Sequence, residues 1–134
     1  TSIYSRLTNL NVIGEYCDID ATCYTAGGLI LGGKKSVYIP SGHTSDKTLY
    51  NINATGLGFI SVSSQGNYRA HVILVGGEVG QIVIVYNSNP YNTNRIVFSE
   101  MNGWGWVTEQ QAAIFVNTSD GWRITNNASK LSGD

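Results

Sequence analysis

Four aromatic residues late in the sequence are the best candidates for binding chemistry. Trp104 and Trp106 are two residues apart, so they share one face of a β-strand, and the glycines beside Trp104 leave the other face bare. Trp122 and Tyr91 are candidates to join them. An aromatic ring offers a flat apolar surface on which a sugar ring stacks, while amides and carboxylates fix the sugar hydroxyls. We therefore predict carbohydrate binding by these four residues; the alternative is that the two neighbouring tryptophans fill the core.

Acidic residues give two weaker candidates for chemistry. Two carboxylates among Glu78, Glu100 and Glu109 would form a glycosidase pair if their strands converged. Asp18 and Asp20 are spaced to share one face of a strand, where they could hold a cation together. No further ligands stand near these aspartates in the sequence, so a solvated strand edge is the preferred interpretation.

The histidines and cysteines do not form a recognisable site. His43 has Ser and Asp neighbours within 41–46, but a catalytic triad requires a base oriented in folded space, and no Gly-x-Ser-x-Gly motif is present. His71 is interpreted as a core or interface histidine. Cys17 and Cys23 lack metal-binding partners, and the loop between them is short, so we expect free, buried thiols. We predict no catalytic residue, no cofactor and no metal.

Composition limits the class of protein. The chain has 134 residues, of which 13% are charged, and its net charge is −1. A nucleic-acid-binding protein needs a basic face, and a membrane span needs a long apolar stretch; the sequence has neither. Abundant Asn, Ser, Thr and Gly are typical of an extracellular or virion β-protein. The length fits one folded domain. We predict a connecting segment at 1–33 that packs on a β-sandwich domain at 34–134.

Short runs rich in β-branched and aromatic residues alternate with turn signals every eight to twelve residues. This spacing predicts an all-β fold, an antiparallel β-sandwich of the jelly-roll type. No internal repeat of fixed period is visible. The expected strands are 36–39, 48–54, 57–63, 72–75, 82–86, 95–99, 103–107, 112–116 and 122–125.

The stretch 68–86 is predicted to form a β-hairpin with apolar residues on both faces. In its first strand, Val72 and Leu74 point one way and Ile73 and Val75 point the other. A two-layer sandwich buries only one face of each sheet, so the second face needs a cover. Because the N-terminal segment supplies few large apolar residues, we expect another copy of the chain to cover it.

The order of these segments resembles the C-terminal modules of bacteriophage tail fibres and tailspikes, including the knob modules of pyocin-type fibres. The resemblance covers about 36–107 and lies in the short strands, the polar turns and the late aromatics. It implies a homotrimeric β-sandwich tip that locks three chains together and binds host-surface glycan. It carries over no catalytic residue. The segments are Lys47-Thr48-Leu49-Tyr50, Gly58-Phe59-Ile60-Ser61-Val62, the apolar stretch 68–86, Arg95-Ile96-Val97-Phe98 and Gly103-Trp104-Gly105-Trp106.

Together these features predict a non-enzymatic tip domain of a viral fibre or spike, located in the virion. Its expected partners are two further copies of the chain and a host-surface polysaccharide, with no nucleic acid and no membrane insertion. The alternatives are a free-standing carbohydrate-binding module or lectin and, third, a small glycan hydrolase that uses a carboxylate pair.

Overall fold

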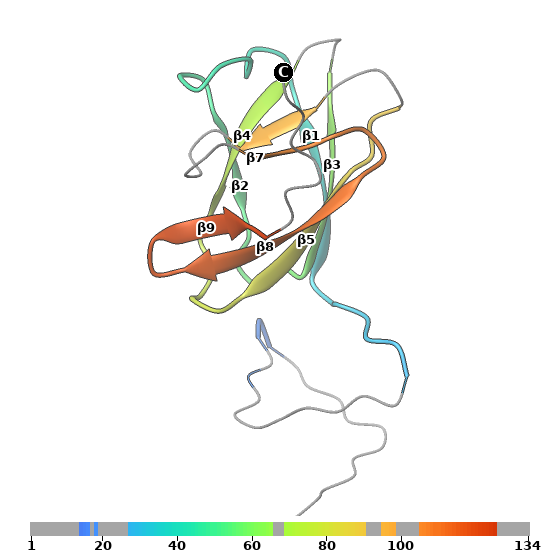
Figure 1. Ribbon diagram of the computed structural model, residues 1–134, viewed down its shortest axis with the longest axis vertical. Helices are drawn as coiled ribbons and strands as arrows, with labels where there is room; N and C mark the ends of the chain where they lie inside the picture. Colours follow the sequence, from blue (N-terminus) through green and yellow to red (C-terminus); the bar gives the residue numbers. More distant parts are fainter. Residues whose placement is uncertain are drawn as a thin grey trace, which may run out of the picture.

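The fold is all-β, as predicted. The computed structural model describes residues 14–16, 18, 27–65, 69–90, 95–98 and 105–125. Within these ranges the chain forms nine strands and no helix (Figure 1). Each strand overlaps a segment predicted from the sequence. The strands are β1 (Lys34–Ile39), β2 (Tyr50–Asn53), β3 (Phe59–Ser64), β4 (Ala70–Val75), β5 (Ile82–Asn87), β6 (Ile96–Phe98), β7 (Gly105–Val107), β8 (Ala112–Thr118) and β9 (Gly121–Ile124).

The strands form two sheets, and the chain crosses between them with almost every strand. The five-stranded sheet has the order β1-β3-β5-β8-β9, and the four-stranded sheet has the order β2-β4-β6-β7. From β1 to β6 the chain therefore winds as a flattened coil, with one strand of each turn in each sheet. In the five-stranded sheet Lys34 pairs with Phe59 and Phe59 pairs with Ile84, so each turn of the coil advances by 25 residues.

The winding makes the sheets mixed, which corrects the expectation of an antiparallel sandwich. The pairs β1–β3, β3–β5, β2–β4 and β4–β6 are parallel. Among the described strands, the antiparallel pairs are those that involve β7, β8 and β9: β6–β7, β5–β8 and β8–β9. Parallel neighbours need a crossover connection, and here the crossover is a strand of the opposite sheet. The jelly-roll arrangement, which is antiparallel, is not confirmed.

The hairpin predicted at 68–86 is wrong. Its two halves are β4 and β5, which are not paired and belong to different sheets. Gly76 and Gly77 in the connection have φ angles of 74° and 87°. A Cβ on Gly76 would meet the side-chain oxygens of Asn53 and Thr55 at 2.6 Å, so glycine is required for the close approach of this turn to the turn after β2. The glycines carry the chain across the sandwich instead of back along β4.

The core lies between the two sheets and follows the alternation of the strands. From β4 the residues Ala70, Val72 and Leu74 point inward, and from β5 Val83 and Val85 do. Phe98 and Phe115 meet at the centre with ring centroids 4.5 Å apart. The inward residues of the other strands are Ile39, Ile52, Ile60, Val62, Ile96, Val107, Ala113 and Trp122.

Little of the predicted connecting segment 1–33 falls within the described residues. Tyr16 contacts the body, because its hydroxyl oxygen accepts a hydrogen bond from the Gly56 backbone N–H at 3.1 Å. Residues 27–33 lead away from the start of β1 (light blue in Figure 1), and the side chains of Leu29 and Ile30 are exposed. The boundary predicted at 33/34 coincides with the start of β1. Packing of the remainder of this segment stays a prediction.

Candidate functional site

The four predicted carbohydrate-binding residues divide into two buried tryptophans and two residues outside the described ranges. Trp106 is 7% exposed and Trp122 is 6% exposed, so neither presents a whole ring face to solvent. The two lie on different sheets, Trp106 on β7 and Trp122 on β9. Tyr91 and Trp104 lie outside the described residues. Among the described residues, Trp106 and Trp122 therefore behave as packed side chains and do not form a shared flat platform.

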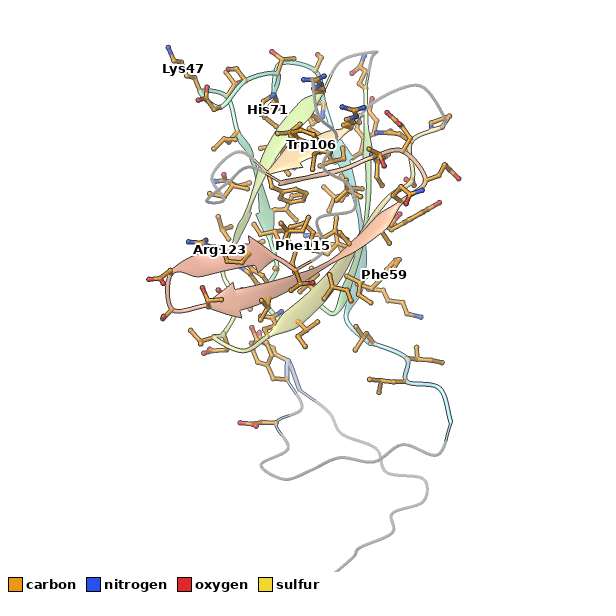
Figure 2. The ribbon with its side chains drawn as sticks, viewed as in Figure 1. Lys47, Phe59, His71, Trp106, Phe115 and Arg123 are labelled. Carbon is orange, nitrogen blue, oxygen red and sulfur yellow. The ribbon has the colours of Figure 1, made fainter. Side chains whose placement is uncertain are left out.

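Trp106 is buried on the outer side of the four-stranded sheet. It pairs across strands with Val97, which pairs with His71, and all three are buried although none belongs to the core between the sheets. We call these three residues the covered row; Figure 2 shows His71 and Trp106 in the same part of the molecule. The guanidinium carbon of Arg95 lies 5.7 Å from the Trp106 ring centroid, a distance at which a cation–π interaction forms. Arg95 therefore covers part of the ring that the platform hypothesis requires to be free.

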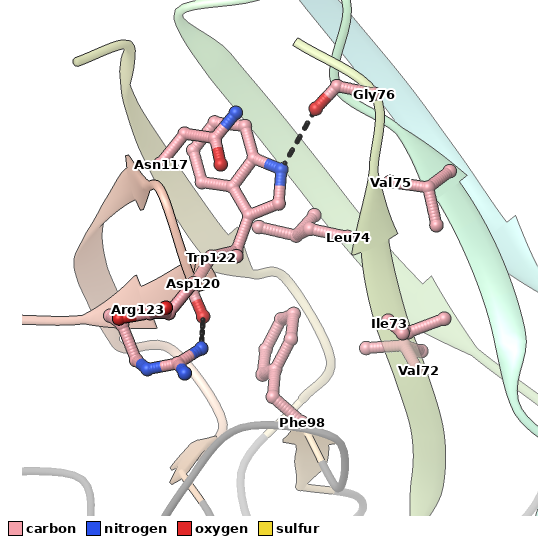
Figure 3. A pocket seen from close by; sticks show the side chains of 11 residues that line it. Val72, Ile73, Leu74, Val75, Gly76, Phe98, Asn117, Asp120, Trp122 and Arg123 are labelled. Atoms are coloured by element: carbon pink, nitrogen blue, oxygen red, sulfur yellow. Dashed lines mark hydrogen bonds between the residues drawn. The ribbon is translucent and has the colours of Figure 1, made fainter. Parts of the chain in front are cut away.

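Trp122 instead forms a wall of a cleft between the two sheets (Figure 3). Its indole N–H donates a hydrogen bond to the Gly76 carbonyl oxygen at 3.0 Å, which fixes the ring against the turn after β4. The cleft has a volume of about 430 Å³, within the roughly 300–1,000 Å³ range of small-molecule sites. Its apolar lining comes from β4, from Phe98 of β6 and from Trp122, and its polar lining comes from the end of β8 and the start of β9.

Three polar side chains stand around this cleft: Asn117, Asp120 and Arg123. Asn117 pairs across strands with Trp122. The backbone of Asn117 is held on both sides, since its N–H donates to the Gln81 oxygen at 2.9 Å and its oxygen accepts from the Gly80 N–H at 2.7 Å. Arg123 donates from Nη1 to the Trp122 backbone oxygen at 2.9 Å.

The turn between β8 and β9 positions these groups. The Thr118 hydroxyl donates to the Gly121 oxygen at 2.7 Å and accepts from the Asp120 backbone N–H at 3.1 Å. Gly121 has a φ of 100°, which a residue with a side chain rarely adopts. The segment 117–121 lies between the predicted strands 112–116 and 122–125, and its Asn, Ser, Asp and Gly are typical of a turn. The sequence does not indicate Asn117, Asp120 or Arg123 as site residues. No local sequence motif indicates these three residues, because the cleft that they line is formed together with β4, which is distant in the sequence.

Among the described residues, the other sequence candidates are not brought together. Glu78 lies in the turn before β5, and Glu109 lies in the turn before β8. The turn that carries Glu109 contacts the C-terminal end of β5, because the Asn87 N–H donates a hydrogen bond to the Gln111 backbone oxygen. Glu78 is therefore near one end of β5 and Glu109 near the other. Glu100, Asp20 and both cysteines lie outside the described residues, and Asp18 is exposed. Within the described part of the chain, no three His, Cys, Asp or Glu residues cluster in a way that would hold a metal ion.

Both histidines take part in contacts that hold the loop after β1 near the four-stranded sheet. The Nδ1 atom of His43 lies 2.8 Å from the Thr48 oxygen, and the His43 ring packs edge-on against Tyr50 with centroids 5.0 Å apart. The His71 backbone N–H donates to the His43 oxygen at 2.8 Å. Burial lowers the pKa of His71 below its usual 6.5; nearby Asp46 opposes this shift and Arg69 adds to it. His71 is buried, but it lies on the outer side of the four-stranded sheet and not in the core between the sheets; a role as an interface histidine stays a prediction.

A second candidate surface is the outer side of the five-stranded sheet. Phe59 pairs with Ile84, and Ile84 pairs with Ile114, so these side chains form one row across three strands. Ile82 extends the row along β5, and we call Phe59, Ile82, Ile84 and Ile114 the open face. Ile82 is 52% exposed and Ile114 is 44% exposed, while Phe59 and Ile84 are half-buried. No charged residue occurs in β3, β5 or β8.

Among the residues that the structure describes, no helix has the length and apolar character needed to cross a membrane. No protein-family model, curated protein or solved structure matches this chain.

Proposed function

We propose that this chain is a non-enzymatic tip domain of a viral fibre or spike, which joins three copies of itself and attaches to a host-surface polysaccharide. The observation that carries the proposal is the open face of the five-stranded sheet. It supports self-association, and the resemblance to fibre tips supports the trimeric form and the virion location.

The open face has the composition of an interface core. Contiguous exposed apolar surface is uncommon on a soluble monomer, and interface cores are depleted of charge. Each large apolar side chain moved from full exposure to burial contributes about 1.5–3 kcal/mol, against which the entropic cost of association must be set. The charged residues Lys34, Lys35 and Arg123 lie on the flanking strands β1 and β9, which leaves the three central strands uncharged.

A second copy is the occupant that fits this face best. Identical chains usually assemble with closed symmetry. In a cyclic trimer each copy contacts both neighbours, so an apolar face turned toward the three-fold axis is buried by them. Residues 27–33 leave the body beyond the start of β1 (Figure 1), so three such segments would extend from the same end of an assembly. A stalk that continues from one end is the arrangement expected of a fibre tip.

The site for attachment to glycan is the cleft beside Trp122. It combines apolar walls with an amide, a carboxylate and a guanidinium, which are groups that hold a sugar ring and its hydroxyls. Glu78 and Glu109 lie toward opposite ends of β5, so these two carboxylates are not the converging pair that a glycosidase needs; pairs that include Glu100 lie outside the described residues.

Sedimentation of the intact chain by analytical ultracentrifugation tests the trimer. We expect the native protein to sediment as a trimer and Ile84→Asp to sediment as a folded monomer, because the carboxylate would be buried without a partner in the interface. Asn51→Asp is the matched control, since Asn51 is exposed on the outer side of the other sheet. A monomeric native protein, or a trimer that tolerates Ile84→Asp, would refute the use of the open face.

A free-standing carbohydrate-binding module is the second candidate. It is favoured by one observation: the lining of the cleft shares no residue with the open face, so binding there is independent of association through that face. A monomer that binds glycan would select this function over the trimeric tip.

A further inference from the structure

We infer that the cleft beside Trp122 binds one neutral pyranose residue of a glycan, and that the Asn117 carboxamide orients it. This inference rests on the proposed attachment to glycan and adds the class of sugar and the residues that select it. It concerns a different part of the molecule from the open face, so it does not depend on the trimer.

The first observation is the state of the Asn117 side chain. Asn117 is 8% exposed and lines the cleft next to the indole of Trp122 (Figure 3). Among the hydrogen bonds of the described residues, its backbone groups take part in two, and its carboxamide takes part in none. Although the residue as a whole is buried, both carboxamide atoms remain accessible to solvent, so a ligand in the cleft can reach them. An amide carries both a donor and an acceptor, and a sugar hydroxyl can satisfy both.

The second observation is the apolar wall that faces this amide. Val72, Leu74 and Phe98 are inward-pointing residues of the four-stranded sheet, and Trp122 closes the other side of the cleft. The hydrogen bond from Trp122 to Gly76 fixes the indole, so the wall is formed without a ligand. A pyranose matches this combination because its ring C–H groups are apolar while its hydroxyls point outward from the ring.

The third observation is the charge at the mouth of the cleft. Asp120 carries one negative charge and Arg123 one positive charge, and no other charged residue lines the cleft among the described residues. These two charges sum to zero, so the cleft offers no net attraction for an ion: a carboxylate sugar meets Asp120 as well as Arg123, and an amino sugar meets Arg123 as well as Asp120. A charged sugar must also give up the hydration of its own charge on entering the apolar cleft. A neutral sugar avoids this cost and can still accept from the guanidinium and donate to the carboxylate.

The test follows the Trp122 indole N–H signal and the Asn117 side-chain NH₂ signals by NMR on the intact chain. The probes are the methyl glycosides of glucose, galactose and mannose, with methyl glucuronide and glucosamine as the charged counterparts. We expect at least one neutral glycoside to shift these signals in a saturable manner and the charged sugars to bind at least about tenfold more weakly. Absence of any such shift with the neutral glycosides would refute the inference.

Asn117→Ala distinguishes a ligand-binding amide from a structural one. We expect it to weaken binding of the neutral glycoside about tenfold, the effect of one lost hydrogen bond, with an unchanged or higher Tm. The matched control is Asn51→Ala, an exposed asparagine of β2 that should leave both binding and Tm unchanged. Unaltered binding by Asn117→Ala, or a lower Tm, would contradict the role given to Asn117.

Asp120→Asn tests the charge selection. It removes the negative charge from the mouth of the cleft and should bring the affinity for methyl glucuronide to within about threefold of that for the neutral glycoside. Failure to gain the glucuronide would refute the charge-based selection. If the native protein and Asn117→Ala bind the same sugars on a glycan array, attachment to glycan stands and the cleft assignment fails. If the native protein binds no glycan, the proposed attachment fails as well.

Discussion

The two sheets both direct apolar side chains away from the core, yet the outcome differs on the two sides of the molecule. On the four-stranded sheet the covered row of His71, Val97 and Trp106 is buried. On the five-stranded sheet the open face remains accessible, with Ile82 more than half exposed. The outward-pointing apolar residues of a strand therefore do not by themselves indicate an interface.

The cover of the four-stranded sheet comes from the chain itself. The loop after β1 reaches the sheet through the hydrogen bond from the His71 N–H to the His43 oxygen, and Arg95 lies over Trp106. No equivalent loop contact or cation–π contact is found over the open face among the described residues. The covered row therefore contributes to the stability of the fold, whereas the open face remains exposed in the single chain.

Introducing a charge should give the largest difference in the free energy of unfolding between the covered row and the open face. Val97→Asp places a carboxylate at a position that is 2% exposed, and we expect it to prevent folding, with a loss above about 4 kcal/mol. Ile114→Asp makes the same kind of change on the open face, and the monomer should lose no more than about 1 kcal/mol. Circular dichroism and urea unfolding of both variants measure the contrast. Equal losses would show that the two sides do not differ in this way.

Removal of an aromatic ring should have the next largest effect. Trp106→Ala should reduce the free energy of unfolding by about 3–5 kcal/mol, because a large buried side chain leaves a cavity. Tyr38→Ala, an exposed aromatic on the outer side of β1, is the control and should change it by about 0.5 kcal/mol or less. Urea unfolding monitored by circular dichroism provides the values. A small loss for Trp106→Ala would reopen the possibility of a binding platform at that ring.

The smallest expected effect is a pH dependence of the free energy of unfolding that arises from His71 in the covered row. Since burial lowers the pKa of His71 below 6.5, the unfolded chain binds a proton more readily than the folded chain in the interval below pH 6.5. His71 therefore stabilises the fold fully above that pH, and its contribution decreases as the pH falls toward its folded-state pKa. Unfolding measured across this interval should show the decrease in the native protein. His71→Gln should remove that part of the pH dependence, and an identical profile in both proteins would exclude His71 as its source.

The candidate site was only partly accessible from the sequence. Trp122 was selected for its aromatic ring, and it lines the cleft, but as a buried wall fixed by Gly76. Asn117 follows the predicted strand 112–116 and is instead part of β8, and nothing in its sequence neighbourhood indicates an amide that lines a cleft. Its environment is created by β4, which lies more than forty residues earlier in the chain.

The positions of the strands were determined by the sequence itself, because β-branched runs and polar turns act over a few residues. All nine strands lie at or within a few residues of the predicted segments. The absence of a visible repeat also has a reason in the structure. The four-stranded sheet advances unevenly: Tyr50 pairs with Val72, 22 residues on, whereas Ala70 pairs with Ile96, 26 residues on.

Strand pairing and the burial of each face were decided only by the tertiary structure. A glycine-rich connection such as 76–80 allows the chain either to turn back or to cross over, and local backbone preferences do not distinguish the two paths. Crossing is selected by contacts between distant segments, such as those of the Gln81 side chain, which donates to the oxygens of Ala54 and Leu57 at 2.7 and 2.8 Å. In β4 and β5 apolar residues occupy both faces of the strand, and neither strand contains Asp, Glu, Lys or Arg. The sequence pattern within a strand does not show which face is covered. The cover comes from loops that are distant in the sequence, and these contacts form only in the folded chain.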